Sequence, residues 1–521
     1  MWFGMATMMI LPAWSLTIFP DYLNRITSRR LTEGVSAMKR RTFIKSVGAL
    51  GFTASLPTLF SSESLIKQVA AAPALDDVNF VAPPVMPQVI NVFLYGGPSE
   101  LAGNLTNIDD INGNSQNSYP GSLLRPTTDE NGRITRNGFW SDAGGEAMED
   151  MLASGDMSIY RTVYRRKNNT RAHRPSIFSC LTGNLDIDNS PGMGTTLAAV
   201  LYKNRASLSK PIEQMVLPFV SFEGASTAFI SDPNNPLPLA MRSISLDQKF
   251  DNPYSRGSNE FGTALENLAA QMSVGADTRY AKAYAGFKTR RSLEQLIDGF
   301  ATELDSGSLP QLPEGDVDAG DDGRLQYPNT RYTDRIKAAV TLAIANPDSL
   351  FITVGGGLGG WDDHNSAVDE YTDRMQALMT TLRAATKHIR YATRPGGGST
   401  GNIIINVFGD FGRNVNLNNS MGWDHGNNQN LYTFGGADLR PAGALGKVVG
   451  KTERFGSSKQ NRQFTRPTDD SYEFEPTAIA ATVYKYFGVQ NPEVLTRDTQ
   501  YSPQGETAIN ESAAGEPPMF S

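Results

Sequence analysis

Cysteine and histidine, two side chains that often hold transition metals, are scarce in this chain. The 521 residues include one cysteine, Cys180, and four histidines. A single cysteine excludes an intramolecular disulfide and any zinc site made of several thiolates, so a metal ion here would need oxygen and imidazole ligands. Cys180 falls in an apolar segment, where we expect it to pack in the core.

Acidic residues outnumber basic ones outside the N-terminal region. Residues 1–72 hold eight Lys or Arg and three Asp or Glu, so the formal net charge of −7 becomes −12 for residues 73–521. That balance disfavours nucleic acid as a partner. Beyond residue 72 no apolar run has the length of a bilayer crossing, so we expect no stable membrane span in the mature chain.

Residues 38–74 have the pattern of a twin-arginine signal peptide. The sequence KRRTFIK at 39–45 combines paired arginines with an aromatic, an aliphatic and a basic residue, and a weakly apolar run with small residues for a signal peptidase follows. This predicts export by the twin-arginine translocation machinery, to a periplasmic or extracellular location; a basic stretch before a buried helix is the alternative. Because Met38 stands directly before the motif, we interpret residues 1–37 as a non-native upstream extension, or otherwise as a membrane anchor.

Apolar runs alternate with helix-like segments along residues 75–521. We expect strands at 89–95, 158–163, 216–222, 349–354 and 402–408. Helices are expected at 145–153, 175–181, 195–203, 332–346, 368–390 and 477–486. The alternation predicts one α/β domain whose largely parallel central sheet is sandwiched by helices. It stops at about 223–330, which we interpret as an insertion with helices at 260–272 and 279–304 and a solvated acidic loop at 313–324.

Two glycine-containing segments place aspartate beside histidine after expected strands. Asp362 and His364 follow the fourth expected strand, and Asp424 and His425 lie beyond the fifth. Open α/β sheets bind ligands at the ends of their strands. Carboxylate oxygen and imidazole nitrogen suit a divalent cation, with Zn²⁺, Mn²⁺, Ca²⁺ and Mg²⁺ as candidates. We therefore predict a metal site there; the alternative is two glycine turns with exposed side chains.

The end of the first expected strand carries two further candidates. Ser99 could be a nucleophile and Glu100 a metal ligand, or both could simply begin a helix. Gly355 to Gly360 satisfies the pattern G-x-G-x-x-G, but Trp361 follows where a dinucleotide site needs a helix to begin. We therefore expect no dinucleotide cofactor.

Histidine and arginine elsewhere suggest anion binding. His173 and Arg174 stand at an expected helix N-terminus, which attracts anions, although capping and surface charge would explain them equally well. Arg413 is a candidate anion ligand or ion-pair partner. We interpret His388, in the middle of a long helix, as an ordinary surface residue.

Five motifs, in this order, resemble the bacterial family known as domain of unknown function 1501, a relative of the alkaline phosphatase and sulfatase superfamily. The resemblance covers about residues 89–488, and twin-arginine signals are typical of the family. The motifs are Gly96-Gly97, His173 with Thr182-Gly183, Gly360 to His364, Asp410 to Arg413, and Asp424 to Gly426.

The resemblance implies an alkaline-phosphatase-like fold and hydrolysis of a phosphate or sulfate ester with one or two metal ions. Asp362 and His364 would then bind metal, as would Asp410 together with Asp424 and His425. The family has Glu where this chain has Asp410, and the superfamily's nucleophile has no certain counterpart, with Ser99 and Ser176 as candidates.

The leading hypothesis is an exported metal-dependent hydrolase of a small anionic ester. Metal would activate Ser99 or a water, and Arg174 or Arg413 would hold the anion. The main rival is a non-catalytic, metal-stabilised binding or assembly protein of the cell envelope. A redox protein is a third hypothesis, disfavoured by the missing cysteine ligands.

Overall fold

The computed structural model describes residues 73–99, 137–168, 170–185, 190–231, 241–250, 293–355, 360–455, 464–497 and 504–517, and a few isolated positions: 128, 131, 237, 238, 263, 264, 267, 268 and 271. The expected upstream extension and the signal peptide, apart from its last two residues, lie outside the described residues. So do Glu100, most of the expected helix at 260–272 and the first part of the one at 279–304.

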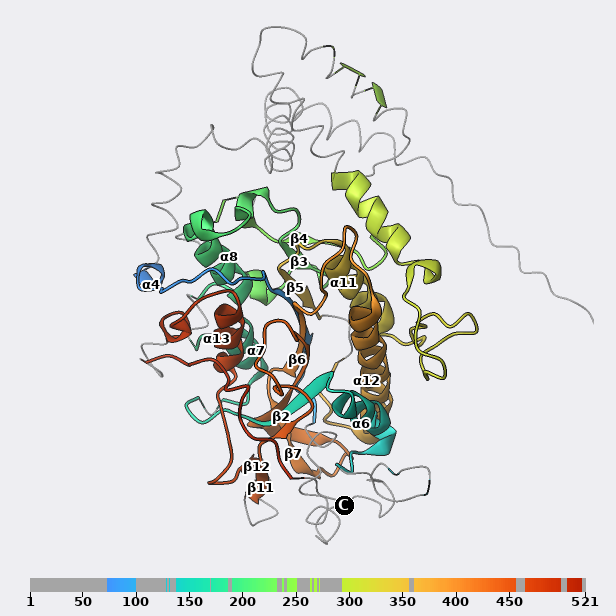
Figure 1. Ribbon diagram of the computed structural model, residues 1–521. Helices are drawn as coiled ribbons and strands as arrows, with labels where there is room; N and C mark the ends of the chain where they lie inside the picture. The colour runs from blue at the N-terminus through green and yellow to red at the C-terminus, as the bar shows by residue number, and fades with distance from the viewer. Residues whose placement is uncertain are drawn as a thin grey trace, which may run out of the picture.

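An eight-stranded sheet forms the centre of the molecule, in the order β10-β2-β9-β6-β1-β5-β3-β4 (Figure 1). Every neighbouring pair in it is parallel except for the two that β9 makes, with β2 and β6. The strands are β1 (Gln88–Leu94), β2 (Met157–Tyr164), β3 (Phe219–Ser221), β4 (Ile244–Ser245), β5 (Phe351–Val354), β6 (Ile403–Gly409), β9 (Asn428–Gly435) and β10 (Val448–Val449). The prediction of a mostly parallel central sheet is confirmed.

The middle strands are apolar on both faces because helices cover both. All seven residues of β1 are buried, and Val89 to Val92 lie in register with β5 on one side and β6 on the other. Burying each Val, Ile or Phe side chain contributes about 1.5–3 kcal/mol. This explains the continuous apolar runs, which are typical of strands covered on both sides.

Helices cover both faces of the sheet (Figure 1). On one face lie α6 (Gly145–Ala153), α11 (Thr333–Ala345) and α12 (Ala367–Tyr391). On the other lie α7 (His173–Thr182), α8 (Met193–Lys203) and α13 (Thr477–Tyr486). In α12, Tyr371, Met375, Leu378 and Leu382 recur at helical spacing and are fully buried, so one stripe of this long helix faces the core.

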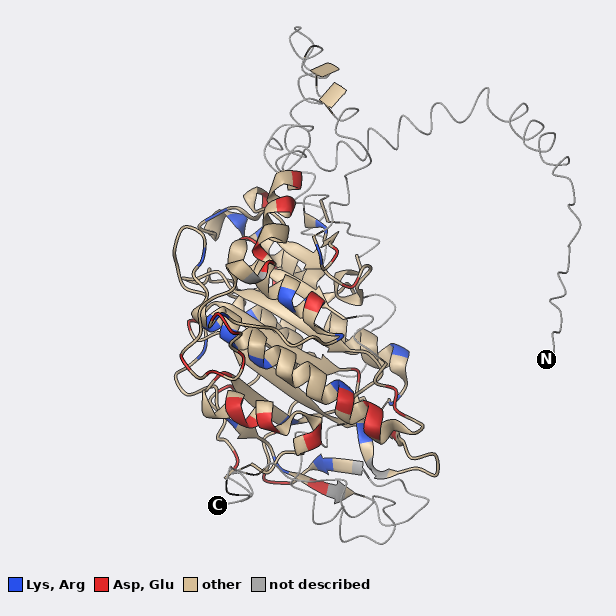
Figure 2. Ribbon diagram, turned by 90° about the vertical axis from the view of Figure 1, so that its right-hand side faces the viewer, with Lys and Arg blue, Asp and Glu red and all other residues tan. Residues whose placement is uncertain are grey.

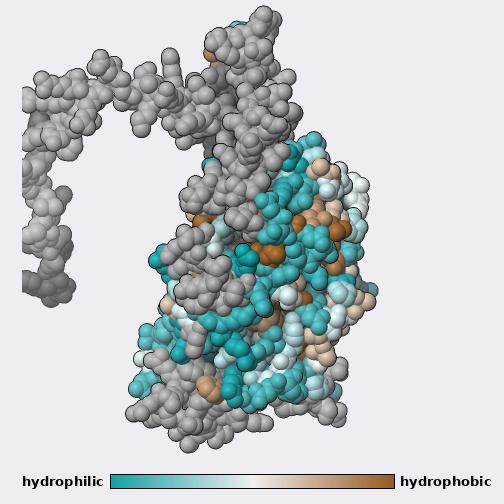
Figure 3. Space-filling model, turned by 90° about the vertical axis from the view of Figure 1, so that its left-hand side faces the viewer, coloured by the Kyte–Doolittle hydropathy of each residue, from teal (hydrophilic) through white to brown (hydrophobic). Residues whose placement is uncertain are grey.

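Charged and hydrophobic residues are distributed as this layering requires. Figure 2 shows Lys, Arg, Asp and Glu on outer helix surfaces and in loops, whereas the central strands in that view are tan. On the side where α8 and α13 lie, hydrophilic residues predominate and hydrophobic ones form separate patches (Figure 3). Within the described part of the chain, no helix has both the length and the hydrophobicity that a membrane crossing needs.

Two small antiparallel sheets lie beside the large one. They are formed by β7 (Gly412–Leu417) with β8 (Trp423–Gly426), and by β11 (Thr452–Phe455) with β12 (Phe464–Pro467). A short helix, α4 (Pro73–Asp76), precedes β1. His425, which follows the fifth expected strand, lies on β8, a strand that the sequence did not predict.

The interpretation of His388 as a surface residue is wrong. The end of the insertion packs on α12, leaving His388 only 5% exposed, with its Nδ1 3.0 Å from the Tyr327 hydroxyl. The acidic loop is not simply solvated either. Asp318 is buried, and its Oδ2 lies 2.9 Å from Arg383 Nε and 2.7 Å from Lys387 Nζ, both on α12.

Candidate metal centre

The strand directions bring separate segments to one edge of the sheet. β1, β2, β5 and β6 run the same way, so Gly96, Asp362 and Asp410 lie beyond the ends of β1, β5 and β6, and His173 follows β2. β9 runs the opposite way and begins at this edge, directly after β8 with His425. An open α/β sheet places its ligands at such an edge.

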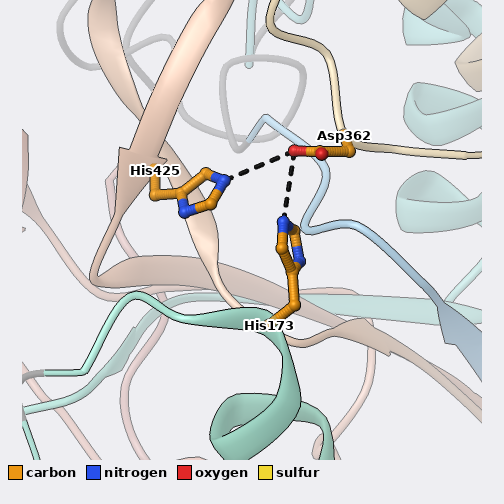
Figure 4. Close-up of side chains that lie close together, drawn as sticks. All are labelled: His173, Asp362 and His425. Atoms are coloured by element: carbon orange, nitrogen blue, oxygen red, sulfur yellow. Dashed lines mark hydrogen bonds and ion pairs between the residues drawn. The ribbon is translucent and has the colours of Figure 1, made fainter.

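Three imidazoles surround one carboxylate oxygen. Asp362 Oδ1 lies 3.3 Å from Nε2 of His173, 3.0 Å from Nε2 of His364 and 3.3 Å from Nε2 of His425. The Nε2 atoms of His364 and His425 are 2.9 Å apart. Figure 4 shows His173 from the start of α7 and His425 from its strand, both turned towards Asp362. The Asp362 side chain is 47% exposed, so solvent reaches the group.

The other ring nitrogen of each histidine meets an oxygen. His173 Nδ1 lies 2.7 Å from Asp410 Oδ2, and His425 Nδ1 lies 2.6 Å from the carbonyl oxygen of Arg171. His364 Nδ1 lies 3.4 Å from Asp424 Oδ1. Metal-binding histidines commonly donate their second N–H to a carboxylate or carbonyl, which fixes the ring and leaves the opposite nitrogen free for the ion.

The donor set of this group fits a cation. The Arg171 carbonyl can only accept, so His425 carries its proton on Nδ1, and burial lowers the pKa of His425 and favours the neutral ring. Its Nε2 lone pair then faces the Asp362 carboxylate and His364 Nε2. Such a concentration of lone pairs is unfavourable unless a proton or metal ion lies among them.

Arg413 lies on the buried side of the site and donates a hydrogen bond to the Asp362 carboxylate. It is 1% exposed; its Nε donates to the Gly97 carbonyl at 2.6 Å and its Nη2 to Asp362 Oδ1 at 2.8 Å. Burial alone would raise the pKa of Asp362, but the hydrogen bond and charge of Arg413 and the nearby histidines hold that pKa below its usual value. Further Arg413 donors reach the carbonyls of Gly96, Trp361 and Trp423. Arg413 is therefore buried against the protein rather than presented to a ligand.

Asp410 is fully buried between two partners. Its Oδ1 accepts a hydrogen bond from the Gly96 amide at 3.0 Å, while its Oδ2 contacts His173 and raises that imidazole's pKa. Gly96 has a φ of 112°, and a Cβ there would lie 2.4 Å from the Asp362 amide nitrogen. Only glycine therefore fits this turn.

Several site residues make contacts that differ from the roles expected from the sequence. The ligand atoms of Asp362, His425 and His173 lie close enough together to hold one metal ion, and His364 contacts Asp362 and His425 beside them. Asp410 and Asp424 approach Nδ1 atoms instead, and His173, expected to bind substrate, joins the ligand set. The sequence feature that could have predicted this role is the position of His173 at the start of a helix that follows β2, because β2 ends at the same edge of the sheet.

The expected nucleophiles and Arg174 lie differently. Ser99 is 1% exposed and Ser176 is completely buried, so neither hydroxyl is presented to solvent, where an ester would enter. Arg174 is exposed on the first turn of α7, and its guanidinium lies 5.7 Å from the ring centre of Phe178. Cys180 is buried in the core, as expected, and burial raises the pKa of its thiol to about 11.

Comparison of the chain with models of known protein families and with curated proteins finds no match. The resemblance to domain of unknown function 1501 therefore stays a prediction, and the argument for function rests on the geometry of the site.

Proposed function

We propose that the chain binds one divalent cation at His173, Asp362, His364 and His425, and that, once exported, it hydrolyses a phosphate or sulfate ester there. One observation carries the proposal: three Nε2 atoms converge on a single carboxylate oxygen while each Nδ1 meets an oxygen acceptor. A set of three imidazoles and one carboxylate suits Zn²⁺ or Mn²⁺ better than Ca²⁺ or Mg²⁺, which prefer oxygen ligands.

An ion in this place would polarise an ester oxygen and lower the pKa of a bound water. The surrounding residues orient the ligands for it. Asp410 holds the Nδ1 side of His173, and Arg413 keeps Asp362 ionised and fixed in direction. Because both candidate serine hydroxyls are buried, water is the better nucleophile for this proposal. The position at the edge of a mostly parallel sheet also supports the alkaline-phosphatase-like fold as part of the proposal.

One feature favours the rival, a metal-stabilised protein without catalysis. Four protein ligands complete a tetrahedral zinc site, whereas catalytic zinc keeps a position open for water. The exposure of the ligands, from 21% for His425 to 47% for Asp362, favours catalysis, since substrate could approach the ion. A five- or six-coordinate ion would reconcile four protein ligands with an open position.

Metal content and turnover separate these alternatives. We would purify the chain from Ala74 onward, measure bound metal by mass spectrometry, and assay a panel of phosphate and sulfate esters. We expect about one metal ion per chain, lost in His364→Ala and His425→Ala. His388→Asn is the matched control, because it alters the one histidine outside the site and should keep the metal.

Each outcome distinguishes one hypothesis from another. Metal together with turnover, both lost in the His425→Ala variant, would support the hydrolase. Stoichiometric metal without turnover on any ester would favour the rival. Metal content that both His→Ala substitutions leave unchanged would overturn the site itself.

A further inference from the structure

Arg161 of β2 is a buried arginine that has no hydrogen-bond acceptor and no ion-pair partner among the residues that the structure describes. The residue is 4% exposed, and its Nε is shielded from solvent without a hydrogen-bond acceptor. Among the residues described, none accepts a hydrogen bond from its guanidinium. Burying an unpaired charge is strongly unfavourable, so a buried arginine is normally held by a carboxylate or by several carbonyls.

A β-bulge brings Arg161 to this place. In the pairing of β2 with β9, Tyr160 lies opposite Leu431 and Val163 opposite Gln429, so two residues of β2 face the single residue Asn430. A bulge of this kind redirects a side chain and is frequent beside functional sites. Tyr160 and Leu431 pack in the core on the α7 and α13 side, so the alternation along the strands places Arg161 and Asn430 on the opposite face.

Two of the neighbours on that face are neutral amides. Asn428 shares the face with Asn430, and its Nδ2 donates to the Arg161 carbonyl at 2.8 Å, while its Oδ1 is buried without a partner. β7 and β12 pack on β9, and β12 also packs on β2, so the small sheets lie against the two strands that carry these residues (Figure 1).

No described carboxylate neutralises Arg161. Glu516 is the acidic residue whose charge acts on it, but Glu516 lies 3.8 Å from Lys451 rather than at ion-pair distance from Arg161. Burial lowers the pKa of Arg161 to about 10, so the guanidinium is still charged at neutral pH. A single buried positive charge among neutral amides therefore lacks one negative charge.

We propose that the buried guanidinium of Arg161, beside Asn428 and Asn430, binds a small inorganic anion, either a halide or an oxyanion such as phosphate. The site is separate from the metal ligands and does not depend on the proposed hydrolase. Because the anion would sit between β2, β9 and the strands packed over them, its binding stabilises the attachment of the small sheets. Asn428 follows His425 by three residues, so this packing also supports the strand that carries His425.

Thermal unfolding in different anions tests the proposal. The purified chain would be melted at constant ionic strength in gluconate, with chloride or inorganic phosphate substituted stepwise. We expect the midpoint of unfolding to rise and saturate with at least one of the two, as it does for a ligand that binds only the folded state. The anion that acts at the lower concentration identifies the site as selective for a halide or for an oxyanion.

Variants locate the effect. Arg161→Met should remove the anion-dependent shift and, in gluconate, unfold no earlier than the wild type, because it removes a buried charge of similar length and volume. Arg161→Lys keeps the charge but loses the planar guanidinium and its fixed set of N–H donors. The anion concentration for half-saturation should therefore rise by about tenfold. Arg466→Met is the control, because Arg466 is partly exposed on the adjacent β12 and pairs with Glu453. It should respond to anions as the wild type does.

Three results would overturn the proposal. One is a wild-type midpoint that follows ionic strength alone, which would mean that ordered water satisfies Arg161. Another is an unchanged anion response in Arg161→Met. If Arg161→Met does not fold, the third result is an anion concentration for half-saturation in Arg161→Lys that equals that of the wild type.

Discussion

Asp410 has no contact with solvent, yet it determines how His173 is presented. One carboxylate oxygen accepts the Gly96 amide and the other contacts His173 Nδ1, so the imidazole turns its Nε2 towards Asp362. Arg413 acts in the same way on Asp362 through a hydrogen bond to its Oδ1. Residues that orient the ligands thus account for much of the geometry, and their effect on affinity can be measured separately from that of the ligands.

Asp410→Asn tests this orienting role. The substitution keeps the shape of the side chain, but an amide can present its NH₂ group to His173 and no longer carries the charge that holds the Nδ1 proton. We expect the fold to persist and metal affinity to fall by about 10–100-fold, measured by competition with a chelator of known affinity. An affinity equal to that of the wild type would show that Asp410 serves only the Gly96 turn.

At the scale of elements, residue patterns predicted helices α6, α7, α8, α11, α12 and α13 and the middle strands to within a few residues. β9 was missed because its sequence, NQNLYTFG, begins with three amide side chains that are buried beside a bulge. Patterns also singled out Asp362, His364 and His425 as candidate metal ligands, and the fold brings these three side chains together. The residue patterns could not show which aspartates contact a histidine Nδ1 and which contact an Nε2, because that depends on how α7 and β8 are packed.

His388 shows how a packed element changes a residue's behaviour. Burial under the end of the insertion lowers the pKa of His388 to about 3, and the charge of Lys337 adds to this. In the unfolded chain that pKa is about 6.5. Between these values the unfolded state binds a proton that the folded state does not, so His388 contributes stability above pH 6.5 that is lost as the pH falls towards 3.

His388→Asn should therefore reduce the loss in the free energy of unfolding that occurs as the pH falls below 6.5. Asparagine can still accept from the Tyr327 hydroxyl, but it does not titrate. From pH 6.5 to 5, the stability advantage of the wild type over the variant should shrink by about 2 kcal/mol, because each pH unit changes it by about 1.4 kcal/mol. Urea unfolding at pH 5, 6.5 and 8 measures this difference. Parallel profiles for the two proteins would mean that His388 is charged in the folded state.

For the whole molecule, the proposed metal would join parts that are far apart in sequence. His173 belongs to α7 on one face of the sheet, Asp362 and His364 to the segment that leads into α12 on the other, and His425 to β8. An ion bound to all four would hold both helical layers to the same edge. Its binding energy would then contribute to the stability of the entire domain and not only to that of the loops.

Removing the metal should accordingly lower the unfolding temperature of the intact chain. At a free metal concentration about 1,000 times the dissociation constant, binding contributes about 4 kcal/mol, and chelation removes it. We expect the melting temperature to fall after EDTA treatment and to recover when Zn²⁺ or Mn²⁺ is returned. His425→Ala should melt like the chelated wild type and should not respond to EDTA, whereas Asp410→Asn should respond but recover only at higher metal concentration. A single cooperative transition that shifts as a whole would show that the ion stabilises both layers, while a small early transition alone would confine its effect to the edge.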